Sequence, residues 1–174
     1  MVTTINTVLA LLTVLGGALF LIGTGAIIFR RDLFRRFPAR FALPAAFIVA
    51  LIATAGSLFY SEIAGYTPCE LCWFQRILMY PQVILLGVAL AVKDQKIMRY
   101  ILWLSGIGAF IALYHYLIQL GFLPGACDVS GYSVSCSQRF VLEYGYITIP
   151  MMALTAFLLN ILLSIRARLE GHSQ

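Results

Sequence analysis

The chain has 174 residues, of which 61% are hydrophobic and only 11% are charged. Soluble domains are about half apolar and about a quarter charged, so this composition excludes an ordinary soluble domain. The net charge of +5 does not indicate nucleic-acid binding, because the basic residues form short clusters between long apolar runs and no basic stripe alternates with aromatic residues.

Five apolar segments are long enough to cross about 30 Å of hydrocarbon as helices of about 20 residues. Helix is the expected state, because an isolated strand in lipid leaves its backbone polar groups unpaired. The first segment lacks a basic n-region and is longer than the apolar run of a signal peptide, so we interpret it as a retained helix. The predicted spans are Thr7–Phe29, Phe41–Tyr60, Trp73–Val92, Met98–Leu120 and Tyr146–Ile165.

The basic residues predict the orientation of these helices. Ten of the twelve Lys and Arg residues lie in the first and third connections and after the last span, a side that the positive-inside rule assigns to the cytoplasm. The N-terminus is therefore expected outside and the C-terminus in the cytoplasm. The ten residues are Arg30, Arg31, Arg35, Arg36, Arg40, Lys93, Lys96, Arg99, Arg166 and Arg168.

All four cysteines lie on the predicted outer side, where an oxidising compartment permits disulfides. Cys69 and Cys72 precede the third span, and Cys127 and Cys136 lie between the fourth and fifth spans. Three interpretations are open: two static disulfides, a four-thiolate zinc site, or redox exchange. The C-x8-C spacing of the second pair is unlike the two tight C-x2-C knuckles of zinc ribbons. The C-x2-C spacing of the first pair, at a helix N-terminus that stabilises a thiolate, favours redox exchange.

Arg76 lies one helical turn after Cys72 and shares its helix face. A charge just inside the membrane boundary is costly and requires a compensating interaction. Position alone leaves two roles open. The side chain either extends to the lipid headgroups, or it stabilises a thiolate at Cys72 or donates to a carbonyl oxygen of a bound lipid-soluble acceptor.

The run Cys69-Glu70-Leu71-Cys72-Trp73-Phe74-Gln75-Arg76 resembles the C-x-x-C-x-x-x-R signature of the disulfide bond formation protein B family (DsbB, called BdbC in some bacteria). His115 and Gln119-Leu120 ahead of Cys127 are similar to that family's segment before its second cysteine pair, and Gly145–Pro150 is similar to its approach to the last span.

The resemblance covers about residues 41–168 and implies an all-α membrane protein with a four-helix transmembrane bundle of the DsbB type. Residues 1–40 are then an extra N-terminal transmembrane helix with a basic cytoplasmic connection, and residues 169–174 are a cytoplasmic tail. The implied location is the bacterial cytoplasmic (inner) membrane.

The resemblance also implies a relay of electrons. A reduced thioredoxin-fold oxidase of the DsbA type would attack the Cys127–Cys136 disulfide at Cys127. Cys136 would exchange with Cys69, which leaves Cys72 as the thiolate facing a membrane quinone, either ubiquinone or menaquinone. Exchange of this kind proceeds through thiolates and mixed disulfides.

In this relay Arg76 would hold the quinone and His115 would lie near it. From its position alone, a histidine near the outer end of a span is more often an interfacial residue than a functional one. The family match, together with Gln119 one turn further along the same face, leaves both roles open. Two features depart from the family pattern: the extra span Thr7–Phe29, and the short loop of eight residues between Cys127 and Cys136.

Two alternatives to a DsbB-type enzyme stay open at this point. A vitamin K epoxide reductase-like protein is also a small helical bundle with four cysteines, but its C-x-x-C follows the loop pair, whereas here it comes first. A structural membrane protein with two static disulfides is the alternative from outside redox chemistry.

Overall fold

Five helices account for most of the residues that the computed structural model describes, which are residues 1–29, 38–124 and 135–171. They are α1 (Val2–Phe29), α3 (Ala42–Leu58), α4 (Glu70–Val92), α5 (Met98–Gln119) and α6 (Ile149–Gly171). The short helices η1 (Ala39–Phe41) and η3 (Gln95–Ile97) precede α3 and α5, and a π-helical turn η2 (Phe59–Ile63) extends α3.

Each of the five predicted spans corresponds to a helix that is long and apolar enough to cross a membrane, so the all-α membrane fold is confirmed. Several boundaries differ: the first helix begins at Val2 rather than Thr7, and the last ends at Gly171 rather than Ile165. The second span continues through η2 to Ile63, and the third begins at Glu70 rather than Trp73. The last begins at Ile149 rather than Tyr146, because paired backbone hydrogen bonds between Glu143 and Ile147 close a tight turn there.

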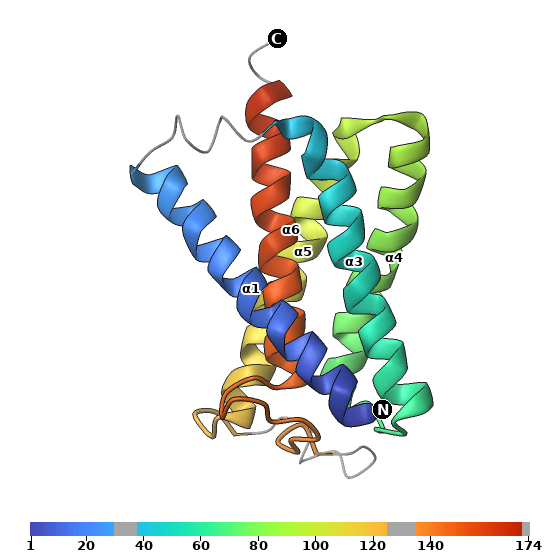
Figure 1. Ribbon diagram of the computed structural model, residues 1–174, viewed down its shortest axis with the longest axis vertical. Coiled ribbons are helices and arrows are strands. Elements are labelled where there is room, and N and C mark those ends of the chain that lie inside the picture. Colours follow the sequence, from blue (N-terminus) through green and yellow to red (C-terminus); the bar gives the residue numbers. More distant parts are fainter. Residues whose placement is uncertain (30–37, 125–134, 172–174) are drawn as a thin grey trace.

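Helices α3, α4, α5 and α6 form a bundle, and α1 runs obliquely across the outside of α6 (Figure 1). The N-terminal end of α1 lies at the same end of the molecule as the start of α4, while the α4–α5 connection and the end of α6 lie at the opposite end. The start of α4, with Cys69 and Cys72, and the loop that contains Cys136 therefore lie at the same end of the bundle as the N-terminus. Arg30, Arg31, Arg35 and Arg36 lie outside the described residues.

The interior of the bundle contains a polar cluster as well as apolar side chains. The amide oxygen of Gln82 accepts hydrogen bonds from Ser105 (3.1 Å) and from Asn160 (3.0 Å), and all three residues are fully buried. These residues come from α4, α5 and α6, so the cluster joins three helices. In lipid the hydrophobic effect does not drive helices together, so interhelical hydrogen bonds of this kind help to hold the bundle together.

Candidate active site at the start of helix α4

The first cysteine pair begins α4. Cys69 is the N-cap of the helix, with extended backbone (φ −73°, ψ 172°), and Cys72 lies in the first turn. Both are free thiols, and their Sγ atoms share a hydrogen bond of 3.2 Å. Cys69 is buried and Cys72 is half-buried. The unpaired backbone N–H groups of a helix N-terminus favour negative charge, so this position favours a thiolate.

The second pair meets the first through Cys136. Sγ of Cys69, Sγ of Cys136 and a ring nitrogen of His115 all lie within 4.8 Å of one another, and all three residues are buried. Cys136 is disulfide-bonded. Its expected partner, Cys127, lies outside the described residues. The two redox pairs are therefore close enough for a sulfur of one to reach a sulfur of the other after a small side-chain movement.

His115 connects these groups from α5. Its Nε2 lies 3.1 Å from the backbone oxygen of Cys136 and 3.7 Å from Sγ of Cys69. A carbonyl oxygen can only accept a hydrogen bond, so Nε2 must carry the proton. Nδ1 lies 3.0 Å from the amide nitrogen of Gln75, which donates to it in the neutral ring. His115 can therefore donate to a thiolate at Cys69, but Nε2 cannot act as a base toward its thiol.

The same contacts change the acidity of Cys69. The hydrogen bond with Cys72 lowers the pKa of Cys69 most, burial opposes this, and the hydrogen bond with His115 lowers it further, to about 4. When Cys69 loses its proton, the Cys72 thiol becomes the donor in their shared hydrogen bond. These contacts therefore favour the thiolate form of Cys69, the sulfur of the first pair that lies near Sγ of Cys136.

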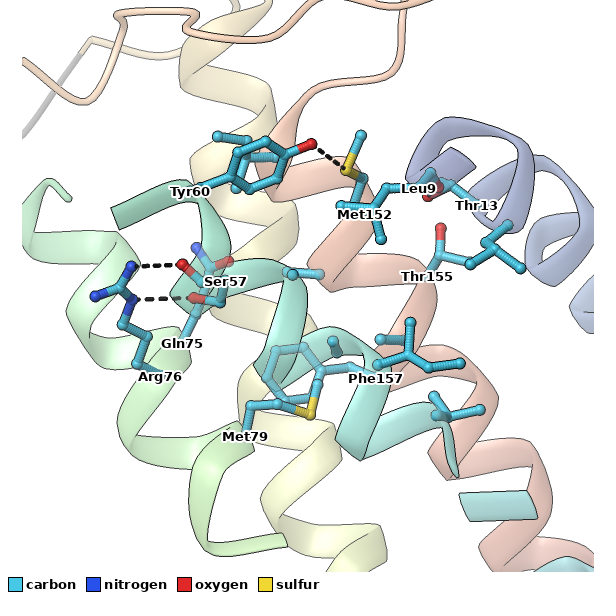
Figure 2. Close-up of a pocket in the computed structure, with 18 of the residues that line it drawn as sticks. Leu9, Thr13, Ser57, Tyr60, Gln75, Arg76, Met79, Met152, Thr155 and Phe157 are labelled. Carbon is cyan, nitrogen blue, oxygen red and sulfur yellow. Dashed lines mark hydrogen bonds between the residues drawn. The ribbon is translucent and has the colours of Figure 1, made fainter. Parts of the chain in front are cut away.

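A cavity of about 390 Å³ opens on the other side of the first pair, between α1, α3, α4 and α6 (Figure 2). Cys72 lines this cavity and Cys69 does not. The polar side chains that α4 contributes to the cavity wall lie in the first half of that helix. Leucine, methionine, phenylalanine and small residues line most of the remaining wall. An apolar pocket with a few convergent polar groups is typical of small-molecule sites.

Arg76 lies at the polar end of the cavity, where α3 holds its side chain. Its Nε donates to Oγ of Ser57 (3.0 Å), and one Nη donates to the backbone oxygen of Ser57 (3.1 Å), as Figure 2 shows. The Tyr80 hydroxyl donates to Oγ of Ser57 (3.1 Å), and the guanidinium lies 5.3 Å from the ring centre of Trp73. These contacts compensate the charge inside the span and orient it beside Cys72.

Aromatic rings contribute to the cavity wall near the cysteines. Tyr66 stacks between Tyr60 and Phe140, with ring centres 5.9 Å and 5.0 Å apart. Tyr60 comes from the π-helical turn η2, and its hydroxyl lies 3.9 Å from the Met152 sulfur. π-Helical turns inside α-helices occur frequently at functional sites. Stacking of these rings stabilises the wall beyond the burial of their surface.

Comparison with known proteins decides the family. Residues 39–167 match the model of the family described as "Disulfide bond formation protein DsbB". The chain belongs to the DsbB family. Among curated proteins, the "Disulfide bond formation protein C" of Bacillus subtilis (strain 168) is 50% identical over 122 residues, which cover 69% of this chain and 87% of the relative. A "Probable disulfide formation protein C" of Halalkalibacterium halodurans is 44% identical over 121 residues, 69% of this chain and 88% of the relative. No solved structure matches the chain.

Membership of the DsbB family makes this chain a membrane oxidoreductase that generates disulfides, and it confirms the expected resemblance. It decides against the vitamin K epoxide reductase-like protein and against two static disulfides. The cluster of Cys69, His115 and Cys136 has the residue types of a metal site, but a disulfide-bonded Cys136 offers no thiolate. This donor set therefore does not fit a zinc centre.

The structure separates the predicted DsbB-type site residues into two groups. Cys72 and Arg76 line the cavity, whereas Cys69, His115 and Cys136 form the junction between the cysteine pairs. His115 was expected near a quinone, and the structure places it at this junction and not in the cavity wall.

Two neighbours of these DsbB-type site residues were not predicted. Gln75 orients His115, and Ser57 holds Arg76. A glutamine inside an apolar span was a usable signal for Gln75, because an amide in lipid requires a partner. A lone serine late in an apolar span carries no comparable signal.

Proposed function

We propose that the protein is a thiol:quinone oxidoreductase, which reoxidises a DsbA-like thioredoxin-fold protein and passes the electrons to a membrane quinone. One observation carries the proposal: the two cysteines of the first pair face different partners. Sγ of Cys69 lies within 4.8 Å of Sγ of Cys136, while Cys72 lines an apolar cavity beside Arg76. This arrangement allows electrons to pass from Cys136 to Cys69, and from Cys72 to an acceptor in the cavity.

The proposed orientation places the cysteines outside the bacterial inner membrane. Lys93 and Lys96 lie in the α4–α5 connection, at the end of the molecule opposite the cysteines. Arg99 is in the first turn of α5, and Arg168 is near the end of α6. The positive-inside rule assigns that end to the cytoplasm. Residues 41–168 then form the relay core, preceded by the extra helix and connection of residues 1–40 and followed by a cytoplasmic tail, residues 169–174.

The relay begins at the loop disulfide. A thiolate of the partner attacks Cys127, forms a mixed disulfide and releases Cys136 as a thiolate. Cys136 attacks Cys69, which breaks the Cys69–Cys72 disulfide and frees Cys72. The second thiolate of the partner then attacks the mixed disulfide, and the partner leaves with its own disulfide. Cys127, now free, attacks Cys136, re-forms the loop disulfide and releases Cys69.

This sequence leaves Cys69 and Cys72 as free thiols and Cys136 in a disulfide, and that is the arrangement of the described cysteines. A quinone supplies the final acceptor, because it takes up two electrons and two protons and becomes a quinol. Cys69 and Cys72 lose those electrons and protons and close their disulfide. The whole turnover converts one dithiol and one quinone into one disulfide and one quinol.

The cavity fits a quinone headgroup in three respects. Its volume of about 390 Å³ is within the range of about 300–1,000 Å³ that is usual for small-molecule pockets. Its lining is mostly apolar, with the Cys72 sulfur at one end. Arg76 also lines it, and Ser57 takes up Nε and one Nη, which leaves the second Nη able to donate to a carbonyl oxygen of the acceptor.

We propose that His115 acts at the junction of the cysteine pairs. Its Nε2–H stabilises the thiolate of Cys69 and holds the backbone of Cys136 beside it. Gln119 fixes the same segment, because its amide nitrogen donates to the Gln138 oxygen (3.0 Å). His115 is thus a positioning residue for exchange between the pairs.

Purified full-length protein in liposomes tests the proposal. Liposomes that contain a quinone should oxidise a reduced DsbA-like protein through many turnovers, with one quinol formed per disulfide. Quinone-free liposomes should oxidise only the amount of partner that the protein's own disulfides can accept. Continued turnover without quinone under anaerobic conditions would contradict the proposal.

The order of the relay has a separate test. In a Cys72→Ser variant, Cys69 has lost its resolving partner, so a Cys69–Cys136 disulfide should accumulate and Cys127 should become free. Peptide mapping after acid quenching detects both changes. A Cys69→Ser variant is the matched control, and it should form no link from Cys72 to Cys136. A Cys72–Cys136 link in that control would refute the assigned order.

A further inference from the structure

Helix α1 lies outside the residues that match the DsbB family model, yet it forms one wall of the cavity. Six residues of α1 line the cavity, and α3, α4 and α6 provide the other helical walls (Figure 2). They are Leu9, Leu12, Thr13, Leu15, Gly16 and Leu19. A helix whose only role is to anchor the chain in lipid has no need to face a cavity beside a redox-active cysteine.

Close packing holds α1 at this position. Gly16 is buried, and a Cβ there would lie 3.0 Å from side-chain carbons of Leu159 and Thr155 on α6. Near the N-terminal end, the Leu9 side chain lies against Gly56 of α3, where a Cβ would meet it at 3.2 Å. Small residues at helix contacts in lipid let backbones approach closely. Contacts with both α3 and α6 therefore hold α1 against the cavity.

The surface that α1 and α6 present to the cavity is apolar even where the residues are threonines. The Thr13 hydroxyl donates to the Leu9 backbone oxygen (2.8 Å), and the Thr155 hydroxyl donates to the Met151 oxygen (3.0 Å). Both hydroxyl protons are used within their own helices, so neither is available to donate to a ligand. The polar groups that a headgroup would use are at Arg76 and Cys72, on α4 at the other side of the cavity.

We propose that α1 is the tail-binding wall of the quinone site: the headgroup lies at Cys72 and Arg76, and the first isoprenoid units of the tail pack on the Leu12–Thr13–Gly16 surface against α6. The inference rests on the quinone oxidoreductase function proposed above. An isoprenoid tail is the occupant that fits, because it is branched, apolar and joined to a polar ring. The extra helix then determines how strongly the tail contributes to quinone binding.

Substituting Thr13 with Phe tests this wall. Thr13 is buried and lines the cavity, so a phenyl ring there fills space that the tail would occupy. The matched control is Gly17→Phe, because a Cβ at Gly17 meets nothing within 4 Å. Apparent KM is measured in liposomes for two acceptors with one headgroup, a quinone without a tail and the same quinone with a long isoprenoid tail.

Thr13→Phe should raise the apparent KM for the long-tailed quinone about tenfold and that for the tail-less quinone by no more than about twofold. Gly17→Phe should match the wild type with both acceptors. A quinone that carries a photoreactive group on its tail should also label α1 peptides in the wild type, and the label should fall in Thr13→Phe but not in Gly17→Phe.

Two results would overturn the inference: equal KM values for Thr13→Phe and Gly17→Phe with the long-tailed quinone, or an equal loss with both acceptors. Either result would mean that α1 does not contact the tail. Failure of the proposed function is a different result and is visible in the wild type alone, which would then reduce neither quinone.

Discussion

Replacing Arg76 with Ala should weaken quinone use and leave exchange among the cysteines intact. The guanidinium donates two hydrogen bonds to Ser57 and has donors left for a carbonyl oxygen of the acceptor. A hydrogen bond from a charged donor contributes about 1.5–3 kcal/mol, which corresponds to about 10- to 150-fold in affinity. Because Arg76 is only partly buried, the lower end applies, and we expect the apparent KM for quinone to rise about tenfold.

Two measurements separate binding from exchange. Steady-state oxidation of a reduced thioredoxin-fold partner across quinone concentrations gives the apparent KM. A single-turnover experiment without quinone gives the rate at which the oxidised protein accepts electrons from the partner. Arg76→Ala should change the first and leave the second within about twofold of the wild type.

Ser57→Ala is a milder change to the same interaction. For Arg76 it removes the Nε–Oγ hydrogen bond and keeps both the charge and the hydrogen bond to the Ser57 backbone oxygen; it also removes the acceptor of the Tyr80 hydroxyl. The loss of one hydrogen bond of about 0.5–1 kcal/mol predicts an increase of about threefold in the same KM. An unchanged KM in Arg76→Ala, or a slower single turnover with normal KM, would refute the placement of the headgroup at Arg76.

Three further predictions concern the junction and the bundle. His115→Phe removes the Nε2 donor, so exchange between Cys136 and Cys69 should slow about tenfold, as measured by acid-quenched alkylation, with an unchanged KM for quinone. The pKa of Cys69 is about 4, below its ordinary value of 9.0, so its thiolate should persist to about pH 5 in ultraviolet absorbance of the reduced protein. Because this pKa is depressed in the folded protein, the Cys69 thiolate stabilises the reduced fold at high pH. The free energy of unfolding should therefore decrease as pH falls from about 9 to about 4, and a constant value across this range would contradict the assignment. A methyl group in Gly108→Ala would overlap the buried Phe157 ring, so it should destabilise the bundle by about 1–3 kcal/mol in thermal unfolding, whereas Gly106→Ala, which meets nothing within 4 Å, should not.

The sequence alone determined the membrane fold and the position of the first cysteine pair at the start of a helix. Five apolar runs of the required length can only be helices in lipid, and each corresponds to a helix of the structure. Cys69 and Cys72 precede an apolar run at a spacing that places them in one helical turn, so their position at a helix N-terminus followed directly. The family signature added the DsbB-type oxidoreductase, which the comparisons confirm.

Only the tertiary structure decided which partner each cysteine faces. Cys69 and Cys72 lie within one turn of α4, and local sequence cannot tell which of them faces α5 and the loop and which faces α3 and α6. The same holds for the partners of His115 and Arg76, because Gln75 and Ser57 become neighbours only when helices pack.

Helix α1 shows most clearly why the packing of a helix in lipid could not be predicted from its sequence. Its apolar residues are spread over all sides of the helix, so hydrophobic periodicity marks no inner face for a helix in lipid. The face toward α6 is chosen by shape, where Gly16 lets α1 approach Leu159 and Thr155. The sequence predicted an extra span, and the packing of that span against α3 and α6 placed it beside the redox site.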